Sequence, residues 1–395
     1  MNTIVRFARS FSPLMSVLVF AACSHQNNAE NNTATNTGNN PSTGSNTTQF
    51  AAAKGCKNVG ILLPESDSSV RYEAYDHPLL EKEIKQAILG VTIQYANANN
   101  NAVTQQNQAE AALAKRACIL VVGPQDGDKA SVIVQRAKAS QVPVIAYDRL
   151  IQDPDTAFYV SFNNARVGEL QGQYIVDQFR KGTFGLKPGA NLAMINGAQT
   201  DNNALQFREG VLEALQPLID SKEINLVFDQ YTPNWDSARA QSSMERILMQ
   251  QNNVQIAYVA NDGMANAVIA ALRARNLDGR VLVTGQDATV TGIQNILTGD
   301  QAMTVYKPIA KQAQVTAQIV AALSNGTDPE ALVNGQTALE SGGQLASVLL
   351  DPIAVDKFNV QQTVIADGYL TREQICNGLN GDMTGICRNV ASAKQ

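Results

Sequence analysis

Residues 119–149 read ILVVGPQDGDKASVIVQRAKASQVPVIAYDR. Residues 119–122 and 142–146 are apolar and rich in β-branched side chains, which is typical of strands buried in a parallel sheet. Residues 128–140 between them have helical period, so the stretch predicts a strand, a covering helix and a second parallel strand. The polar end Tyr147-Asp148-Arg149 follows the second strand, at the sheet edge where ligands bind in open parallel sheets.

The same alternation of strands and helices begins at Lys54 and starts again after about Asn163. This pattern predicts an α/β protein of two doubly wound lobes, as expected for a chain of 395 residues. The expected strands are 59–63, 91–95, 119–122, 142–146 and 158–161 in the first series, and 192–195, 226–228, 256–260, 281–284 and 303–305 in the second.

The chain is expected to cross between the lobes near Asn163, near Lys307 and again with the apolar run 345–351. Such crossings would form a multi-strand hinge. The expected first lobe therefore comprises 54–162 and about 306–344, and the expected second lobe comprises 163–305 and about 345–395.

Residues 1–22 have the features of a secretory signal peptide, because two arginines precede a short apolar run that ends in small residues. Cys23 follows two alanines and resembles the acylated cysteine of bacterial lipoproteins, so we expect a lipid anchor there. The alternative is ordinary cleavage, which requires a small residue where Phe20 stands. Residues 23–53 are dominated by Asn, Thr, Gly and Ser and are expected to be a flexible tether.

Four further cysteines predict two disulfides in an exported protein. Cys56 and Cys118 each precede an expected strand, and neighbouring parallel strands would bring both thiols to the same end of the sheet. Cys376 and Cys387 would close a short loop. A zinc site is the competing interpretation, but the chain has only two histidines. We expect neither a metal nor a cofactor.

Polar and aromatic side chains follow many of the expected strands. Carboxylates accept hydrogen bonds, Arg and Lys donate them, Asn does both, and an aromatic ring covers the C–H face of a sugar. Asp201 and Asp262 equally suit helix caps, and Asp287 suits either role. Trp235 lies in a polar loop, where we expect an exposed stacking role in preference to core packing.

Two classes of function are disfavoured. A net charge of −5 without a basic cluster argues against nucleic acid as a partner. The chain also lacks the glycine-rich phosphate loop, the nucleophile-elbow motif and the zinc-protease motif. Asp148 and Asp287 could form a glycosidase pair, but neighbouring Arg and Lys would favour their ionised forms. We therefore expect a protein that is not an enzyme.

Six segments, in order along the chain, together resemble the periplasmic sugar-binding proteins of ABC importers, the type I family with the ribose-binding fold. They read VIAYDR (144–149), FYVSF (158–162), VGELQ (167–171), DNNA (201–204), GQDA (285–288) and MTVYKP (303–308). The resemblance implies a two-lobed clamp with a sugar between the lobes. Its implied ligand contacts are Arg71, Tyr72, Arg149, Asp201, Asn203, Trp235, Asn261, Asp287 and Lys307, with Tyr72 and Trp235 on the two faces of the sugar ring.

The resemblance also implies a partner and a location. The expected ligand is a monosaccharide, D-xylose first, with another pentose or a hexose such as glucose as the alternative. The expected partner is an inner-membrane ABC permease. The protein itself is expected to be a monomer in the periplasm or cell envelope, held to the membrane through its lipid anchor. A sugar sensor for a chemoreceptor, a sugar-responsive transcription regulator and a glycosidase are the rival functions.

Overall fold

The computed structural model describes residues 50–66, 68–250, 253–379 and 385–387. The expected signal peptide, Cys23 and residues 24–49 of the expected tether lie outside these ranges. Its last residues, 50–53, are described and belong to the folded body, because Phe50 stacks on Phe158 with ring centroids 5.4 Å apart and Ala53 is buried. Within the described ranges, no helix combines the length and the apolar character needed to cross a membrane.

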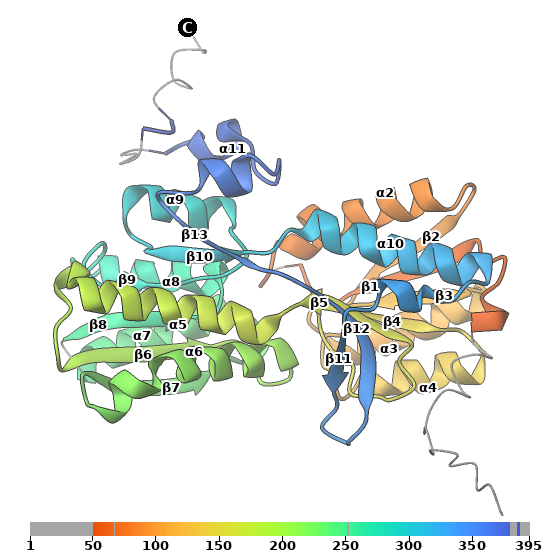
Figure 1. Ribbon diagram of the computed structural model, residues 1–395, viewed down its shortest axis with the longest axis horizontal. Coiled ribbons are helices and arrows are strands. Elements are labelled where there is room, and N and C mark those ends of the chain that lie inside the picture. The colour runs from red at the N-terminus through yellow and green to blue at the C-terminus, as the bar shows by residue number, and fades with distance from the viewer. Residues whose placement is uncertain (1–49, 67, 251–252, 380–384, 388–395) are drawn as a thin grey trace, which may run out of the picture. The chain divides into compact units, whose positions relative to one another are not determined.

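The first lobe is built on a seven-stranded sheet in the order β11-β12-β5-β4-β3-β1-β2, parallel except for the antiparallel pair β11-β12. Helices α2 (His77–Ala87) and α10 (Ile309–Asn325) cover one face, and α3 (Ala102–Ala114) and α4 (Ser131–Ala139) cover the other (Figure 1). Apolar side chains therefore fill both faces of the central strands. The strands are β1 (Asn58–Leu63), β2 (Thr92–Asn97), β3 (Ile119–Val122), β4 (Val144–Tyr147), β5 (Phe158–Phe162), β11 (Gly335–Ala338) and β12 (Gln344–Leu350).

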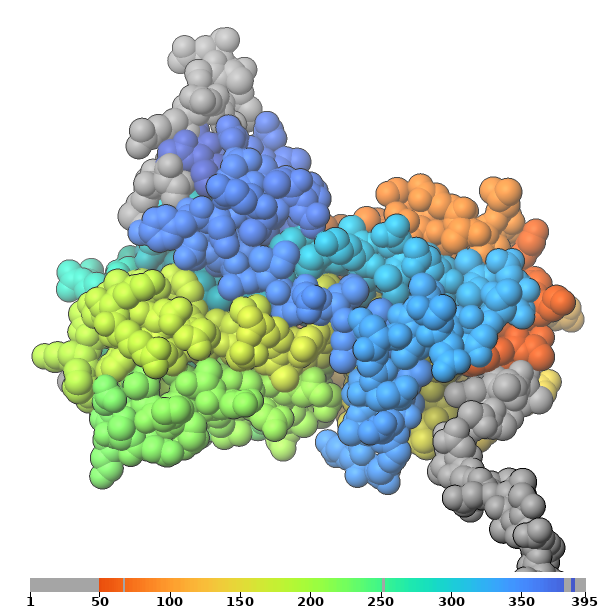
Figure 2. All heavy atoms as spheres, viewed as in Figure 1, coloured from red at the N-terminus to blue at the C-terminus, as the bar shows by residue number. Residues whose placement is uncertain are grey.

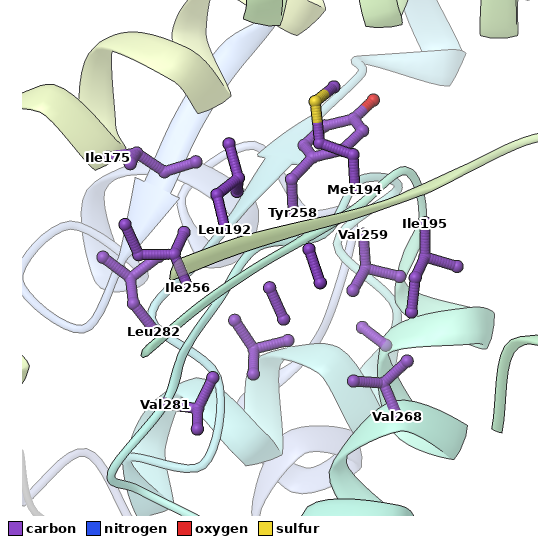
Figure 3. Packing of buried hydrophobic residues seen from close by; sticks show 14 of the residues in the cluster. Ile175, Leu192, Met194, Ile195, Ile256, Tyr258, Val259, Val268, Val281 and Leu282 are labelled. Carbon is purple, nitrogen blue, oxygen red and sulfur yellow. The ribbon is translucent and has the colours of Figure 1, made fainter. Parts of the chain in front are cut away.

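The second lobe holds a four-stranded parallel sheet in the order β7-β6-β8-β9 and the antiparallel pair β10-β13. The side chains of β6 and β8 pack towards helices on both faces, and Figure 3 shows Ile175 of one helix and Val268 of another on either side of them. The strands are β6 (Ala190–Asn196), β7 (Ile224–Tyr231), β8 (Val254–Val259), β9 (Leu282–Val283), β10 (Met303–Tyr306) and β13 (Ile353–Asp356). The helices are α5 (Asn164–Lys181), α6 (Asn202–Asp220), α7 (Ser237–Gln250), α8 (Asp262–Arg273) and α9 (Val290–Thr298).

The chain crosses between the sheets after β5, after β10 and after β12. Strand β12 pairs with β5 of the first sheet, whereas β13 pairs with β10 in the second lobe. The last crossing is therefore at Asp351-Pro352 and not near residue 345, so residues 345–350 belong to the first lobe. Two short apolar strands separated by only these two residues look like one continuous run in the sequence.

Both expected cysteine pairs are bonded in the structure. Cys56 and Cys118 lie beside the paired strands β1 and β3, with Cα atoms 5.6 Å apart. Cys376 and Cys387 have Cα atoms 5.5 Å apart and close the end of the C-terminal segment, which we define as residues 357–379 and 385–387. This segment contains the turn η5 (Gln361–Ile365) and helix α11 (Arg372–Cys376), and it packs its apolar side chains against α9 and β10. Figure 2 shows it in blue on the outer surface of the molecule.

Helices α5 and α6 approach each other unusually closely at two glycines. A Cβ atom on Gly168 would lie 2.0 Å from the carbonyl oxygen of Phe207, and one on Gly210 would lie 2.2 Å from that of Ala165. Only glycine allows this separation, because the obstructing atoms are backbone and cannot rotate away. The close packing fixes α6, whose N-terminal end reaches the cleft.

We expect Gly210→Ala to lower the free energy of unfolding by about 1–3 kcal/mol, because the added methyl group must push the two helices apart. Urea unfolding followed by circular dichroism measures this change. Gly335→Ala is the matched control, since a Cβ there has ordinary contact at 3.6 Å with Leu349. Equal stability of the two variants would contradict the close-packing argument.

Candidate functional site

A single pocket lies where the carboxyl ends of the strands of both sheets face each other. Its residues come from the first lobe, the second lobe and the crossing after β10. The pocket is lined by Ser69, Arg71, Tyr72, Asp148, Arg149, Asp201, Asn203, Phe207, Trp235, Asn261, Gln286, Asp287 and Lys307.

Arg71 is a buried cation of the first lobe that is held by two carboxylates. It precedes the single helical turn η1 (Tyr72–Asp76), and its Nε and Nη2 atoms donate to the two oxygens of Asp76 at 2.8 and 2.7 Å. Its Nη1 atom donates to Asp148 Oδ1 at 2.9 Å. Tyr147 also donates to Asp76, at 2.6 Å. Because the guanidinium is buried and held on two sides, it offers a fixed donor to the pocket.

Asp148 is held at the centre of the site by both its backbone and its side chain. Its φ of +63° is uncommon for a residue other than glycine, and its carbonyl oxygen accepts hydrogen bonds from Tyr159, Ser161 and Asn203. Burial alone would raise the pKa of Asp148, but Arg71, Lys307 and the hydroxyl of Tyr72 lower it well below its usual value. The carboxylate is therefore ionised at neutral pH.

Arg149 connects the two lobes. It is paired with the buried Glu65 of the first lobe, and its Nε atom lies 3.0 Å from Asp201 Oδ2 of the second lobe. Burial raises the pKa of Asp201, an effect that Arg149 opposes. Asp201 also caps α6 by accepting from the backbone N–H of Asn203 at 3.0 Å, so its expected roles as helix cap and as site residue coexist.

Asn203 and Asn261 present amides from the N-terminal ends of two helices. Asn203 donates from Nδ2 to the carbonyl oxygen of Asp148 at 3.0 Å and accepts from Asn164 at 2.8 Å. Asn261 caps α8 by accepting from the backbone N–H of Met264 at 2.9 Å. A backbone hydrogen bond from Gly127 to Thr200, 3.1 Å long, also joins the lobes. The structure is therefore that of a closed clamp.

Asp287 and Lys307 form the third charged part of the pocket. Lys307 Nζ lies 3.3 Å from Asp287 Oδ1 and 3.7 Å from Asp148 Oδ1. Asp287 and Ala288 have φ values of +95° and +50°, which cost energy in residues that carry a side chain. The loop must therefore be held in place by its surroundings.

Asp262 stabilises the loop that contains Asp287 and Ala288. It accepts hydrogen bonds from the backbone N–H of Thr289, the amide of Gln301 and the hydroxyl of Thr304, at 2.8, 2.8 and 2.9 Å. Burial raises the pKa of Asp262 to about 7, against the lowering effect of these three bonds. Asp262 does not line the pocket, and its role is to position the residues that do.

Trp235 and Phe207 supply the apolar wall. The expectation that Trp235 is exposed is wrong, because only 5% of it is accessible and its ring centroid lies 6.4 Å from that of Phe207. The indole covers Gly197, where a Cβ atom would lie 2.1 Å from the ring. The loop of Trp235 is polar in sequence, but it folds inwards over Gly197 and so buries the ring.

All nine residues implied by the resemblance line this pocket. The ligand contacts implied by the resemblance did not include Ser69, Phe207, Gln286 or Asp148, although Asp148 was placed at the sheet edge where ligands bind and considered as one of a glycosidase pair. Asp148 and Gln286 stand beside assigned residues after their strands, so their position was a usable signal. Phe207 lies inside α6, where no strand end points to it.

Four buried polar atoms of the pocket residues lack a hydrogen-bond partner among the residues that the structure describes, and two of them, Nε of Arg149 and Oδ1 of Asp287, still have an ion-pair partner. The other two are Nε1 of Trp235, a donor, and Oε1 of Gln286, an acceptor. Buried polar groups without partners are rare in folded proteins, since each one costs free energy. A ligand with both donors and acceptors would satisfy them.

Comparison with known proteins identifies relatives over most of the chain. The family described as "Periplasmic binding protein domain" matches residues 59–328. A D-xylose-binding periplasmic protein of Haemophilus influenzae is 37% identical over 83% of this chain and 95% of its own. A D-xylose-binding periplasmic protein of Escherichia coli is 40% identical over 79% of this chain and 91% of its own.

Solved structures agree with these relatives. An ABC transporter solute-binding protein from Clostridium phytofermentans with bound β-D-glucose has a TM-score of 0.74 and 29% identity, covering 81% of this chain and all of that one. A carbohydrate transporter solute-binding protein from Chloroflexus aurantiacus in complex with D-glucose has a TM-score of 0.71 and 28% identity, covering 80% of this chain and 97% of that one. The expected type I architecture of two parallel α/β lobes is confirmed.

We expect the stability of Asp262→Asn relative to the wild type to rise with pH. Between pH 4 and 7, folded Asp262 keeps a proton that the unfolded chain has lost, so the wild type loses stability as pH rises. The asparagine does not titrate. The difference should therefore grow by up to about 1.4 kcal/mol per pH unit and level off above pH 7.

Urea unfolding of both proteins at pH 4.5–8 measures this difference. The change of this stability difference with pH is the test. Its value at pH 4.5 also contains the effect of the altered hydrogen bonds of the amide and is not used. A difference that is constant across this range would contradict the assignment of a raised pKa to Asp262.

Proposed function

The chain belongs to the periplasmic binding protein domain family, and from this premise we propose that it is the substrate-binding component of an ABC-type sugar importer. Its proposed ligand is a monosaccharide, D-xylose first, held between the two lobes. The two relatives named for D-xylose support a pentose. The solved relatives with bound glucose make D-glucose the second candidate.

The charges of the pocket favour a neutral ligand. Three carboxylates, those of Asp148, Asp201 and Asp287, and three cations, those of Arg71, Arg149 and Lys307, line it. Two further buried carboxylates behind the lining, those of Asp76 and Glu65, pair with Arg71 and Arg149, so none of the three cations is left without a partner. A phosphorylated or acidic sugar would add an uncompensated buried charge, which is costly. A sugar hydroxyl donates to a carboxylate and accepts from a cation without changing the charge.

The observation that carries the proposal is the unmet hydrogen bonding beside an apolar wall. Nε1 of Trp235 needs an acceptor and Oε1 of Gln286 needs a donor, and a hydroxyl supplies either. We infer that Trp235 and Tyr72 cover the C–H faces of the sugar ring, as the resemblance implies.

The same geometry opposes a glycosidase. General acid catalysis on a glycoside requires a carboxyl group with a raised pKa close to the scissile bond. The pKa of Asp148 is lowered well below its usual value by Arg71 and Lys307 despite its burial. Asp201 has a raised pKa, but it is engaged with Arg149 and with the backbone of α6. We therefore propose a binding function without turnover.

The mechanism that we propose is lobe closure. The contacts of Arg149 with Asp201 and of Asp148 with Asn203 join the lobes and would be lost on opening. A sugar that contacts both lobes favours the closed form, because only that form offers all of its partners. An inner-membrane permease would recognise the closed monomer, and a chemoreceptor is the alternative partner.

The location belongs to the same proposal. The relatives are named as periplasmic proteins. We propose that residues 1–22 direct export, that Cys23 is acylated and that residues 24–49 act as a tether between the membrane and the folded body. The protein would then work at the membrane surface of the cell envelope, next to its permease.

Asp287→Ala should weaken D-xylose binding by about 1–3 kcal/mol, because a buried hydrogen-bonding partner of the sugar is lost. Calorimetric titration with a panel of pentoses and hexoses measures this loss and identifies the preferred sugar. The exposed Asp220 of the same lobe provides the control, and Asp220→Ala should bind as the wild type does. Unchanged affinity in Asp287→Ala would remove that residue from the site.

The wild type should release no product from an aryl xyloside, even at high protein concentration. Binding of D-xylose should also change the emission of Trp235, the single tryptophan of the chain. Turnover would revive the glycosidase hypothesis. Absence of binding to every sugar of the panel would overturn the proposed function.

Cys23→Ser should abolish lipid attachment. Palmitate labelling should then be lost, and the protein should move from the membrane fraction to the soluble fraction, because acyl chains supply the anchor. Labelling and fractionation of bacteria that produce either form measure both effects. Unchanged membrane retention of the serine variant would contradict acylation of Cys23.

A further inference from the structure

Three tyrosines form an aromatic cluster that lies outside the residues lining the pocket. The ring centroids of Tyr75 and Tyr369 are 4.7 Å apart, and those of Tyr306 and Tyr369 are 4.9 Å apart, with tilted planes in both pairs. Such separations are those of favourable aromatic pairs. Tyr369 is therefore the central ring of a continuous stack.

The three rings come from three different parts of the molecule. Tyr75 belongs to η1 of the first lobe, the turn directly after Arg71, and Tyr306 is the last residue of β10 in the second lobe. Tyr369 belongs to the C-terminal segment, which packs on α9 and β10 of the second lobe. The pair Tyr75–Tyr369 thus spans the two lobes.

The C-terminal segment holds Tyr369 firmly on the second lobe. Helix α11 begins with a capping box, in which Thr371 and Gln374 satisfy each other's backbone N–H groups. Gln294 of α9 donates to the carbonyl oxygen of Ile375 at 2.8 Å. The disulfide Cys376–Cys387 closes the segment a few residues later. Tyr369 therefore moves with the second lobe.

Tyr369 also contacts the backbone of a pocket residue. Its hydroxyl donates to the carbonyl oxygen of Asp287 at 3.2 Å. This peptide belongs to the loop in which Asp287 and Ala288 have positive φ values and which needs external support. Burial raises the pKa of Tyr369 well above its usual value, so the hydroxyl keeps the proton that it donates.

We propose that Tyr75 and Tyr369 form an aromatic latch that stabilises the closed form and slows release of the sugar. The inference rests on the proposed function, because it concerns the same cleft. The pair exists only when the lobes are together, so its free energy adds to the closed state and not to the open one. Neither tyrosine lines the pocket, and both act through positioning.

The latch predicts an effect on the dissociation rate more than on the association rate. Encounter of the sugar takes place with the open form, in which the latch is not made, whereas release requires the latch to break. Loss of one aromatic pair should raise the dissociation rate about three- to tenfold. Loss of the Tyr369 hydroxyl removes its hydrogen bond to the backbone of Asp287. This should lower the affinity for the sugar independently of the aromatic pair.

Stopped-flow fluorescence of Trp235 with D-xylose tests the latch in three variants of the full-length protein. Tyr75→Ala removes the cross-lobe ring and should release the sugar three- to tenfold faster, with an association rate within twofold of the wild type. Tyr75→Phe keeps the ring and should behave as the wild type does. Tyr369→Phe keeps the ring, loses the hydrogen bond to Asp287, and should bind more weakly.

Two further measurements separate the latch from a merely structural role and from the proposed function. The thermal unfolding midpoint of ligand-free Tyr75→Ala should stay within about 2 °C of the wild type, since Tyr75 is only partly buried. Small-angle scattering of the ligand-free proteins should show Tyr75→Ala to be more open, even if no sugar of the panel binds.

An unchanged dissociation rate in Tyr75→Ala would overturn the latch and leave the proposed function intact. Absence of sugar binding by the wild type would overturn the proposed function, and the scattering comparison alone would then decide on the latch. Equal scattering curves for the two ligand-free proteins would count against it.

Discussion

The site depends on compensation of buried charge. Arg71 is almost completely buried, and it remains usable because Asp76 occupies two of its donors and Asp148 a third. Without Asp76, the guanidinium would be a buried cation with incomplete pairing, which is strongly destabilising. Asp148 in turn remains ionised because Arg71 and Lys307 approach it from different segments of the chain. The charged groups of the cleft therefore remain ionised only because they are paired with one another.

This compensation also couples recognition to lobe position. The ionic groups come from both lobes and from the crossing after β10, so the network is complete only when the cleft is closed. Arg149, for example, has one carboxylate partner in each lobe, Glu65 and Asp201. In an open form these groups would be hydrated separately. Closure exchanges water for partners on the opposite lobe, and a bound sugar contributes the remaining donors and acceptors.

Much of the fold and of the site could be predicted from the sequence, because each strand is a buried apolar run and each ends in polar residues. The nine ligand contacts that the family resemblance implied line one pocket, although strand ends alone did not single them out. Features that depend on three-dimensional packing escaped prediction. The inward fold of Trp235 depends on Gly197, 38 residues away, and the sheet that takes strand β12 is decided by pairing with β5. The aromatic latch unites residues almost 300 positions apart.

The position of β12 has a consequence for the order of folding. Strand β5 ends at Phe162, but its neighbour β12 begins only at Gln344, so one side of β5 has no strand to pair with until most of the chain is synthesised. An unpaired edge invites incorrect association. It also keeps the nascent first lobe incomplete, and a chain that must be threaded through a membrane before folding gains from such late completion. If residues 1–22 direct export as proposed, this pairing would place completion of the first lobe after most of the chain has crossed the membrane.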